Sequence, residues 1–515
     1  MHEDFREWPS RRGTRVSRRR LVMGAGAMML QMRALAAASP PPADRPDVNA
    51  LSGDVDILQS AYDRLHPGLL RYNTPAQIAA HFGTLRGELA SLPEKGPWLA
   101  PAYLAFAHFA AKIRCGHTYA NFYNQSDAVR KALFENADKL PAEFRWLGSR
   151  MLVTRDLSHE QALPPGTFIV CVNGVPVDQL LTKLIAVARA DGGNDAKRLA
   201  QMEVQGVDRY EAFDVYLPLL APGRDGKIGL ACQRPGVPHT ERLELRALTF
   251  EERLAARRIS PEDKHAGWKF ESTNPLCATL KMPNWALYDS KWDWRAYVAE
   301  CFERLAALKP SALVIDLRGN EGGLDVGDEI LPHLVTTELV IDEPPRLVRY
   351  RDAPANLDPY LDTWDKSFKH WGDDATRFDD RFYALRGDEG AGPRRIVPRG
   401  AHFPGKVFVL IGPDNSSATF QFAQLVRSSS LGTLVGRPTG GNLRGINGGA
   451  FFFLRLPGSG LELDVPLIAR FPPGSPPDAG IIPDIEVRPE ISDILAGRDL
   501  EMAAVRRLLT TNEPS

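Results

Sequence analysis

Two adjacent serines and a glycine-rich loop are the parts of this chain best suited to nucleophilic chemistry. Ser416 and Ser417 follow a short apolar run at residues 407–411 and a turn at residues 412–415. Apolar residues then recur at helical spacing, so the order predicts strand, turn and helix, with the serines at the helix start. A serine there can cap the helix, or it can act as a nucleophile beside helix amides that stabilise an oxyanion.

A second strand leads into the glycine-rich loop. Residues 312–317 form another short apolar run, and the sequence DLRGNEGG follows at residues 316–323, with three glycines within five residues. Loops at the carboxyl ends of parallel strands commonly form active sites, and glycine lets backbone amides approach a ligand. Gly322 and Gly323 therefore form either a simple turn or an oxyanion site. Asp316 and Arg318 are interpreted as a structural ion pair.

Four motifs together resemble the serine peptidases of family S41, which comprises tail-specific (C-terminal processing) and tricorn-like peptidases. The motifs are DLRGNEGG at 316–323, SSAT at 416–419, VGRPTGGN at 435–442 and GIIPDIEV at 480–487. The resemblance implies an α/β fold with a ClpP/crotonase-like ββα catalytic core. It also implies that Ser417 is the nucleophile, that the amides of Ala418 and of Gly322 or Gly323 hold the oxyanion, and that no cofactor or metal is needed.

The general base is predicted to be a histidine. The resemblance places the lysine base of the processing peptidases where this chain has Asn442, and no lysine occurs after Lys406. Arginine cannot replace it, because its side chain stays protonated. His117 lies in CGHT at residues 115–118, which resembles the DGHT motif of the tricorn-like branch. The alternative is that His117 only ends the preceding helix.

The acid that would orient His117 is less clearly indicated. Tricorn-like relatives place a glutamate just before the loop that matches residues 480–484, and Asp478 is the nearest acid here. Glu462, Asp464 or no acid at all are alternatives. Because apolar residues alternate with Glu462 and Asp464, these two are better interpreted as the polar face of a strand.

The first 36 residues are predicted to be a twin-arginine signal peptide. SRRRLV at residues 17–22 precedes a moderately apolar segment that ends in Ala-Leu-Ala, as in secretory signals. The mature protein would then be periplasmic or secreted. Removal of residues 1–36 leaves 55 basic and 61 acidic residues, a net charge of −6. No later apolar stretch reaches the length of about 18 residues that a membrane span requires.

Composition and pattern divide the remaining chain. A hydrophobic content of 43% with 25% charged residues is typical of a globular protein, and the net charge of −1 disfavours nucleic acid as a partner. The expected order is a helical region (37–135), a small β module (136–250), a catalytic domain (265–490) and a C-terminal tail (491–515). The β module is either an ordinary β domain or a PDZ-like one. The insertion at 342–404 is rich in aromatics, which favours a lid over disorder.

These observations predict an exported serine peptidase that hydrolyses peptide or protein substrates through an acyl-enzyme on Ser417. Two alternatives remain open. One is a secreted binding protein that kept the fold and lost catalysis, which the absent lysine favours. The other is an esterase that uses the same residues, because fold alone does not settle the substrate. The oligomeric state is not indicated by the sequence.

Overall fold

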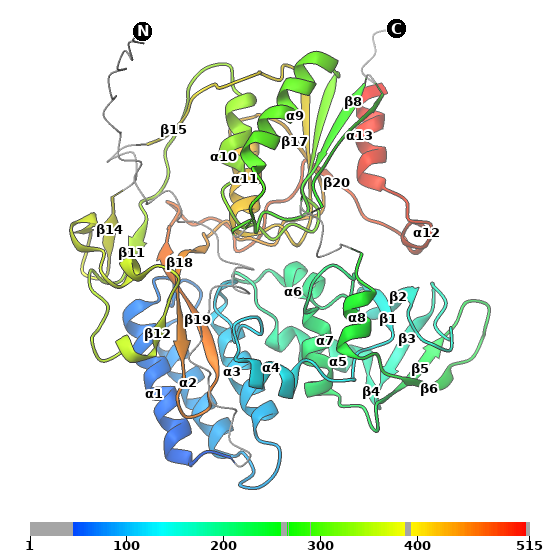
Figure 1. Ribbon diagram of the computed structural model, residues 1–515, viewed down its shortest axis with the longest axis vertical. Helices are drawn as coiled ribbons and strands as arrows, with labels where there is room; N and C mark the ends of the chain where they lie inside the picture. The colour runs from blue at the N-terminus through cyan, green and yellow to red at the C-terminus, as the bar shows by residue number, and fades with distance from the viewer. Residues whose placement is uncertain are drawn as a thin grey trace, which may run out of the picture.

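The computed structural model describes residues 45–258, 265, 267–274, 276–288, 290–386 and 393–510 (Figure 1). The predicted signal peptide lies outside these residues, as do residues 511–515 of the predicted tail. The described part of the chain begins with four helices: α1 (Val48–Leu65), α2 (Pro75–Ala90), α3 (Leu99–Ile113) and α4 (Asp127–Leu133). The start of α2 is fixed by sequence, because Thr74 and Gln77 form a capping box and proline occupies the first helical position. Helix α3 ends at Arg114, whose backbone is left-handed, just before the CGHT motif.

An antiparallel sheet with four helices follows. Its strand order is β1-β2-β3-β5-β6, and β4 pairs with β3 across a turn at Asn173 and Gly174. Both turn residues have positive φ, as the Asn-Gly signal predicts. The elements are β1 (Ala142–Leu147), β2 (Arg150–Asp156), β3 (Phe168–Val172), β4 (Val175–Pro176), α5 (Val177–Val187), α6 (Asp195–Gln201), α7 (Ala212–Leu220), β5 (Lys227–Gln233), β6 (Glu241–Arg246) and α8 (Phe250–Ala255).

A mostly parallel sheet carries the serine turn and the glycine-rich loop. Its order is β20-β17-β16-β9-β8-β7, and only the β7–β8 pair is antiparallel. The strands are β7 (Lys269–Asn274), β8 (Cys277–Lys281), β9 (Ala312–Asp316), β16 (Lys406–Ile411), β17 (Thr433–Gly436) and β20 (Ile485–Glu486). Strands β9 and β16 lie side by side, so the segments that follow them meet at one edge of the sheet.

Helices cover both faces of this sheet (Figure 1). One face packs against α9 (Trp294–Leu308), α10 (Gly327–Ile330) and α11 (Ser417–Ser428), and the other packs against α13 (Leu500–Thr510). The short helix α12 (Ile491–Leu495) precedes α13. Burial on both faces explains why β9 and β16 are almost continuously apolar. The predicted ion pair is confirmed, because Arg318 Nη2 lies 2.8 Å from Asp316 Oδ2.

A second antiparallel sheet is built on the long hairpin of β18 (Asn447–Arg455) and β19 (Glu462–Ala469). Segments of the 342–404 insertion extend it in the order β12-β18-β19-β11-β14-β13. These strands are β11 (Leu347–Val348), β12 (Leu361–Asp362), β13 (Ala375–Arg377) and β14 (Tyr383–Leu385); β10 (Leu339–Ile341) pairs separately with β15 (Arg394–Ile396). The hairpin shares a continuous hydrophobic core with the four N-terminal helices.

This packing changes the interpretation of β19. Every residue of the strand is buried, so Glu462 and Asp464 do not form a solvent-facing polar side as the alternation predicted. Asp464 instead accepts hydrogen bonds from Asn121 at 2.7 Å and Asn124 at 2.9 Å, both in the segment after CGHT. The alternation arose from buried polar contacts with the N-terminal region, which the local sequence does not reveal.

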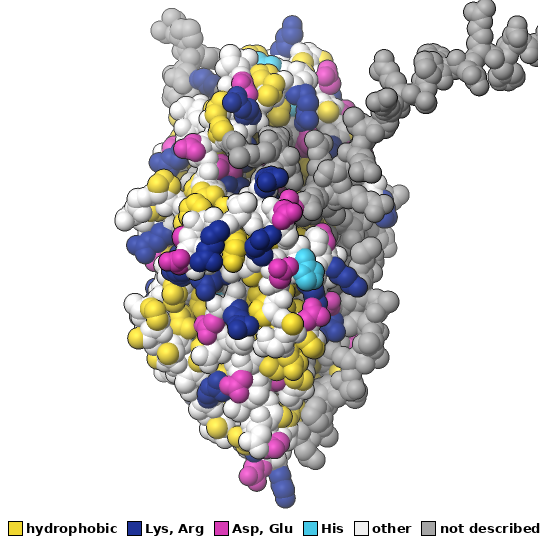
Figure 2. All heavy atoms as spheres, turned by 90° about the vertical axis from the view of Figure 1, so that its left-hand side faces the viewer, with side chains coloured by type: hydrophobic (Ala, Val, Ile, Leu, Met, Phe, Trp, Pro, Cys, Tyr) yellow, Lys and Arg dark blue, Asp and Glu magenta, His cyan; other side chains and the backbone are white. Residues whose placement is uncertain are grey.

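Two surface properties bear on possible partners. No helix in the described part of the chain is both long enough and apolar enough to cross a membrane. On the face shown in Figure 2, basic and acidic side chains are interspersed among apolar ones. This mixture agrees with the small net charge of the chain.

Candidate active site

Ser417 occupies a strained position at the start of α11. Its φ is +50°, which is the left-handed region that non-glycine residues rarely adopt. Asn415 fixes the turn before it: its Oδ1 accepts from the Gly412 amide at 2.7 Å, and its Nδ2 donates to the carbonyl oxygens of Leu317 and Asn320. The turn is therefore tied to the glycine-rich loop, and the left-handed backbone is held in place by these contacts.

The two serines have different surroundings. Ser416 is the N-cap residue by position, but its side chain makes no capping hydrogen bond and is only 3% exposed. Its hydroxyl accepts from Lys197 Nζ at 2.5 Å and donates to the Glu321 carbonyl at 3.1 Å. Ser417 is half-buried and lines a pocket. Only Ser417 is therefore placed to reach a substrate.

The glycine-rich loop packs directly against the serine turn. A Cβ on Gly322 would lie 2.8 Å from the Ser416 carbonyl oxygen and 2.9 Å from Ser417 Cβ, so only glycine fits there. The Gly322 amide donates to Asn320 Oδ1 at 2.9 Å. Gly322 and Gly323 are the two predicted oxyanion donors of this loop. Because Asn320 accepts from the Gly322 amide, Gly323 is the better candidate of the two. Gly323, Ser417 and Ala418 line the same pocket.

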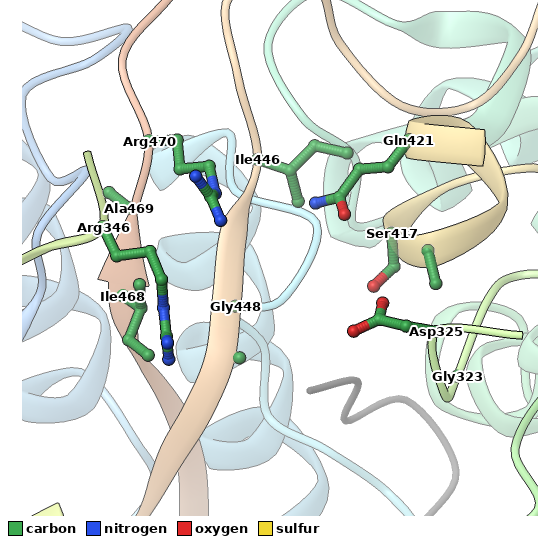
Figure 3. Close-up of a pocket in the computed structure, with 12 residues that line it drawn as sticks. Gly323, Asp325, Arg346, Ser417, Gln421, Ile446, Gly448, Ile468, Ala469 and Arg470 are labelled. Atoms are coloured by element: carbon green, nitrogen blue, oxygen red, sulfur yellow. The ribbon is translucent and has the colours of Figure 1, made fainter. Parts of the chain in front are cut away.

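The pocket is partly open to solvent, and its walls differ in charge. Figure 3 shows Ser417 and Asp325 pointing toward one another from one wall, with Arg346 and Arg470 on the opposite wall. Burial, then the nearby Asp328, raise the pKa of Asp325 to about 7. Arg470 pairs with Glu343 at 2.9 Å. The pocket thus offers groups of both charges beside the serine.

His117 borders this pocket from the N-terminal region. Its Cε1 atom lies 3.9 Å from the position of a Cβ on Gly448, and Gly448 lines the pocket. Its ring also lies 5.6 Å from the ring of Phe451, centre to centre. Among the described residues no hydrogen bond joins His117 to Ser417, and His117 Nδ1 is buried without a hydrogen-bond partner.

The protonation of His117 is determined by its surroundings. Burial lowers the pKa of His117 most, the cations of Arg189 and Lys197 lower it further, and Glu321 opposes them; the result is a pKa of about 3. At neutral pH the imidazole is therefore uncharged. This is the form that can accept a proton from a serine hydroxyl.

Asp478 does not contact His117 in the structure. Its Oδ1 accepts from the Gly193 amide at 2.8 Å and from Asn442 Nδ2 at 2.7 Å. Asn442, at the position of the absent lysine, is fully buried and also donates to the Asp191 carbonyl at 3.1 Å. Asp478 and Asn442 thus hold the 191–193 segment to the catalytic domain, and the structure places neither of them beside the His117 ring.

An ionic cluster beside the serine turn, in which only Lys197 is fully buried, was not anticipated from the sequence. It consists of Arg189, Lys197 and Glu321, with Arg189 Nη2 at 2.7 Å from Glu321 Oε2. Lys197 is 1% exposed, and burial lowers its pKa. Burial alone would raise the pKa of Glu321, but Arg189 and Lys197 outweigh it and hold the pKa at about 2. The only available sequence signal was the glutamate inside DLRGNEGG.

Comparisons with known proteins agree with this architecture. The chain matches the solved structure of mature CPAF complexed with lactacystin with a TM-score of 0.59, 15% identity, and coverage of 90% of this chain and 99% of that one. It matches a second crystal structure of mature CPAF with a TM-score of 0.55, 14% identity, and coverage of 90% and 98%. No curated protein sequence matches the chain. At these identities the structural matches show a shared fold.

The family comparison supports a serine-type peptidase. Residues 277–487 match the model of peptidase family S41. The match covers β8 to the end of the β20 segment, and so contains both the glycine-rich loop and the serine turn. His117, Arg189 and Lys197 lie outside it.

Proposed function

We propose that this protein is an exported peptidase that cleaves peptide bonds through an acyl-enzyme on Ser417, with His117 as general base. The observation that carries the proposal is the left-handed Ser417 at a helix start, in one pocket with Gly323 and Ala418. A strained nucleophile beside backbone amides is a recurring arrangement in acyl-transfer enzymes. The substrate is a peptide or protein, and the signal-like first 36 residues support a periplasmic or secreted location.

The reaction follows from this placement. Ser417 Oγ attacks the scissile carbonyl carbon while its proton passes to the neutral His117 imidazole. The carbonyl oxygen becomes an oxyanion, which the amides of Ala418 and Gly323 stabilise. His117 then gives the proton to the leaving amine as the C–N bond breaks. Water attacks the resulting ester, His117 takes its proton, and the proton returns to Ser417 as the acid product leaves.

Ser417 and His117 would work without an acid that is hydrogen-bonded to the imidazole. Asp478 is engaged with Asn442 and Gly193, and Asp464 with two asparagines. A buried imidazole without a carboxylate partner is a weak base in the free enzyme. We propose that the tetrahedral oxyanion and the negative Glu321 stabilise the imidazolium when it forms, as opposite charges do in a buried site.

Active-site labelling tests the proposal. The chain from residue 37 onward is treated with a fluorophosphonate probe, and the modified residue is located by mass spectrometry. Labelling of the wild type is expected at Ser417, none in Ser417→Ala, and labelling slowed by about 100-fold or more in His117→Ala. Ser416→Ala is the matched control, and it should still be labelled because Ser416 does not line the pocket.

Substrate class is tested with the same proteins. A mixture of unmodified peptides should be cleaved by the wild type and left intact by Ser417→Ala. Hydrolysis of small esters without any peptide cleavage would support the esterase alternative. A folded wild type that reacts with neither the probe nor the peptides would overturn the proposal and leave a binding protein on the peptidase fold.

A further inference from the structure

One guanidinium group links the histidine loop to the glycine-rich loop. Arg189 Nη1 donates to the Gly116 carbonyl at 2.9 Å, and Nη2 donates to Glu321 Oε2 at 2.7 Å. Gly116 precedes His117, and Glu321 precedes Gly322. The same guanidinium lies 4.6 Å from the centre of the Tyr119 ring, two residues beyond His117. Arg189 thus contacts both sides of the histidine and the loop that would hold the oxyanion.

The segment that carries Arg189 holds the histidine loop at several points. Asp191 Oδ1 accepts from the Gly116 amide at 2.9 Å, so both polar backbone groups of Gly116 bind this segment. The Gly192 amide donates to the Arg114 carbonyl at 2.9 Å. A Cβ on Gly116 would lie 2.8 Å from Asp191 Oδ2, which shows how closely the two segments pack.

The other end of the bridge is equally constrained. Glu321 also accepts from Gln201 Nε2 at 3.3 Å, and its backbone carbonyl accepts from the Ser416 hydroxyl at 3.1 Å. Glu321 remains ionised, because the neighbouring cations keep its pKa at about 2. An ionised carboxylate and a planar guanidinium form a directional pair, so the Arg189 contact fixes the position of Glu321 as well as its charge.

We propose that Arg189 is a positioning residue that holds the His117 loop and the oxyanion loop in register and places its positive charge beside the His117 loop. This inference rests on the proposed function, since it assigns a role within the same site. Arg189 does not line the pocket and therefore acts through His117 and Glu321. It comes from the end of the α5 region, outside the matched peptidase segment, so the β module supplies part of the active-site framework.

Three substitutions separate geometry from charge. Arg189→Gln should lower kcat for peptide cleavage by about 100-fold with a much smaller change in KM, the size expected for misplaced catalytic groups. It should also move the acidic limb of the kcat/KM profile to higher pH, since a cation that disfavours imidazolium is gone. Arg189→Lys should keep that limb near its original pH while kcat still falls. Methylguanidinium added to Arg189→Gly should restore part of the rate.

Arg198 provides the matched control. Arg198 is another arginine of this region, 7% exposed, and it donates to the Gly192 carbonyl at 2.8 Å without contacting Glu321. Arg198→Gln should lower stability and leave the acidic limb unmoved. Equal activity losses in Arg189→Gln and Arg198→Gln, with no shift of the limb in either, would overturn the proposal and make Arg189 merely structural.

A second measurement tests the role of Arg189 and does not depend on catalysis. In full-length protein labelled at histidine carbons, an NMR titration follows the His117 ring directly. Arg189→Gln is expected to raise the pKa of His117, and an unchanged value would overturn the electrostatic part of the proposal. A wild type that fails to cleave peptides but shows this shift contradicts the proposed peptidase function alone, so the two failures are distinguishable.

Discussion

At the scale of single residues, the site depends on backbone positions that admit few side chains. Gly323 has a φ of +143°, and a Cβ there would lie 2.2 Å from the carbonyl carbon and oxygen of Trp285. Such a clash with backbone atoms cannot be relieved by turning a side chain. The amide of Gly323 and its place in the pocket therefore depend on the absence of a side chain.

The first prediction compares two glycines of the same loop. Gly323→Ala should displace the loop and lower the rate of fluorophosphonate labelling of Ser417 by about 100-fold, as expected when one oxyanion donor is lost. Gly319 also has a positive φ, +78°, but a Cβ added there would have no heavy atom within 4 Å. Gly319→Ala is therefore the control variant. It should cost about 1–2 kcal/mol of stability and leave the labelling rate nearly unchanged. Equal rates in both variants would contradict an oxyanion role for Gly323.

The sequence was sufficient to predict the local parts of the site but not the distant ones. The strand, turn and helix around Ser417 are encoded within about twenty neighbouring residues, and the structure has them as β16, the Asn415 turn and α11. The Arg189–Glu321 pair is separated by 132 positions and the Lys197–Ser416 pair by 219. Pattern and spacing carry no information on such contacts, because they depend on how two separately formed units pack.

At the scale of elements, the β18–β19 hairpin is held by the first helix. Asp54 of α1 is fully buried, and its two carboxylate oxygens accept from the amides of Gly458 at 2.7 Å and Ser459 at 2.6 Å in the hairpin turn. The same hairpin carries Gly448 beside His117. The N-terminal helices therefore support one wall of the pocket as well as supplying the histidine.

The second prediction removes this anchor. Asp54→Asn should lower the free energy of unfolding by about 1–3 kcal/mol, because the amide nitrogen cannot accept and leaves one buried N–H unpaired. Asp56→Asn is the control. Asp56 lies on the same helix, its side chain is 68% exposed, and it pairs with Arg86. The control should change stability by less than about 1 kcal/mol. Urea unfolding of both variants is the measurement, and equal losses would show that the hairpin contact contributes nothing specific.

At the scale of the whole molecule, buried ionisable groups make stability depend on pH. Burial is the main cause that lowers the pKa of both His66 and His117 to about 3. His66 is bonded as a neutral ring, with Thr118 Oγ1 at 2.8 Å from its Nε2 and the Gly68 amide at 3.1 Å from its Nδ1. Buried acids have the opposite effect on the pH dependence of stability, since burial raises the pKa of Asp464 to about 7.

The contribution of His66 to this pH dependence can be measured by comparing the wild type with a variant that lacks it. Between about pH 6.5 and pH 3 the unfolded chain binds a proton at each histidine while the folded protein does not. Each buried histidine therefore makes the free energy of unfolding fall by about 1.4 kcal/mol per pH unit as the pH decreases through this range. The variant His66→Asn should show a slope shallower by this amount between pH 6 and pH 4 in urea unfolding, whatever its stability at neutral pH. The exposed His239→Asn is the control for loss of a histidine as such. Equal slopes for the wild type and His66→Asn would mean that His66 is protonated in the folded protein, and that burial in this helical region does not hold its imidazole neutral.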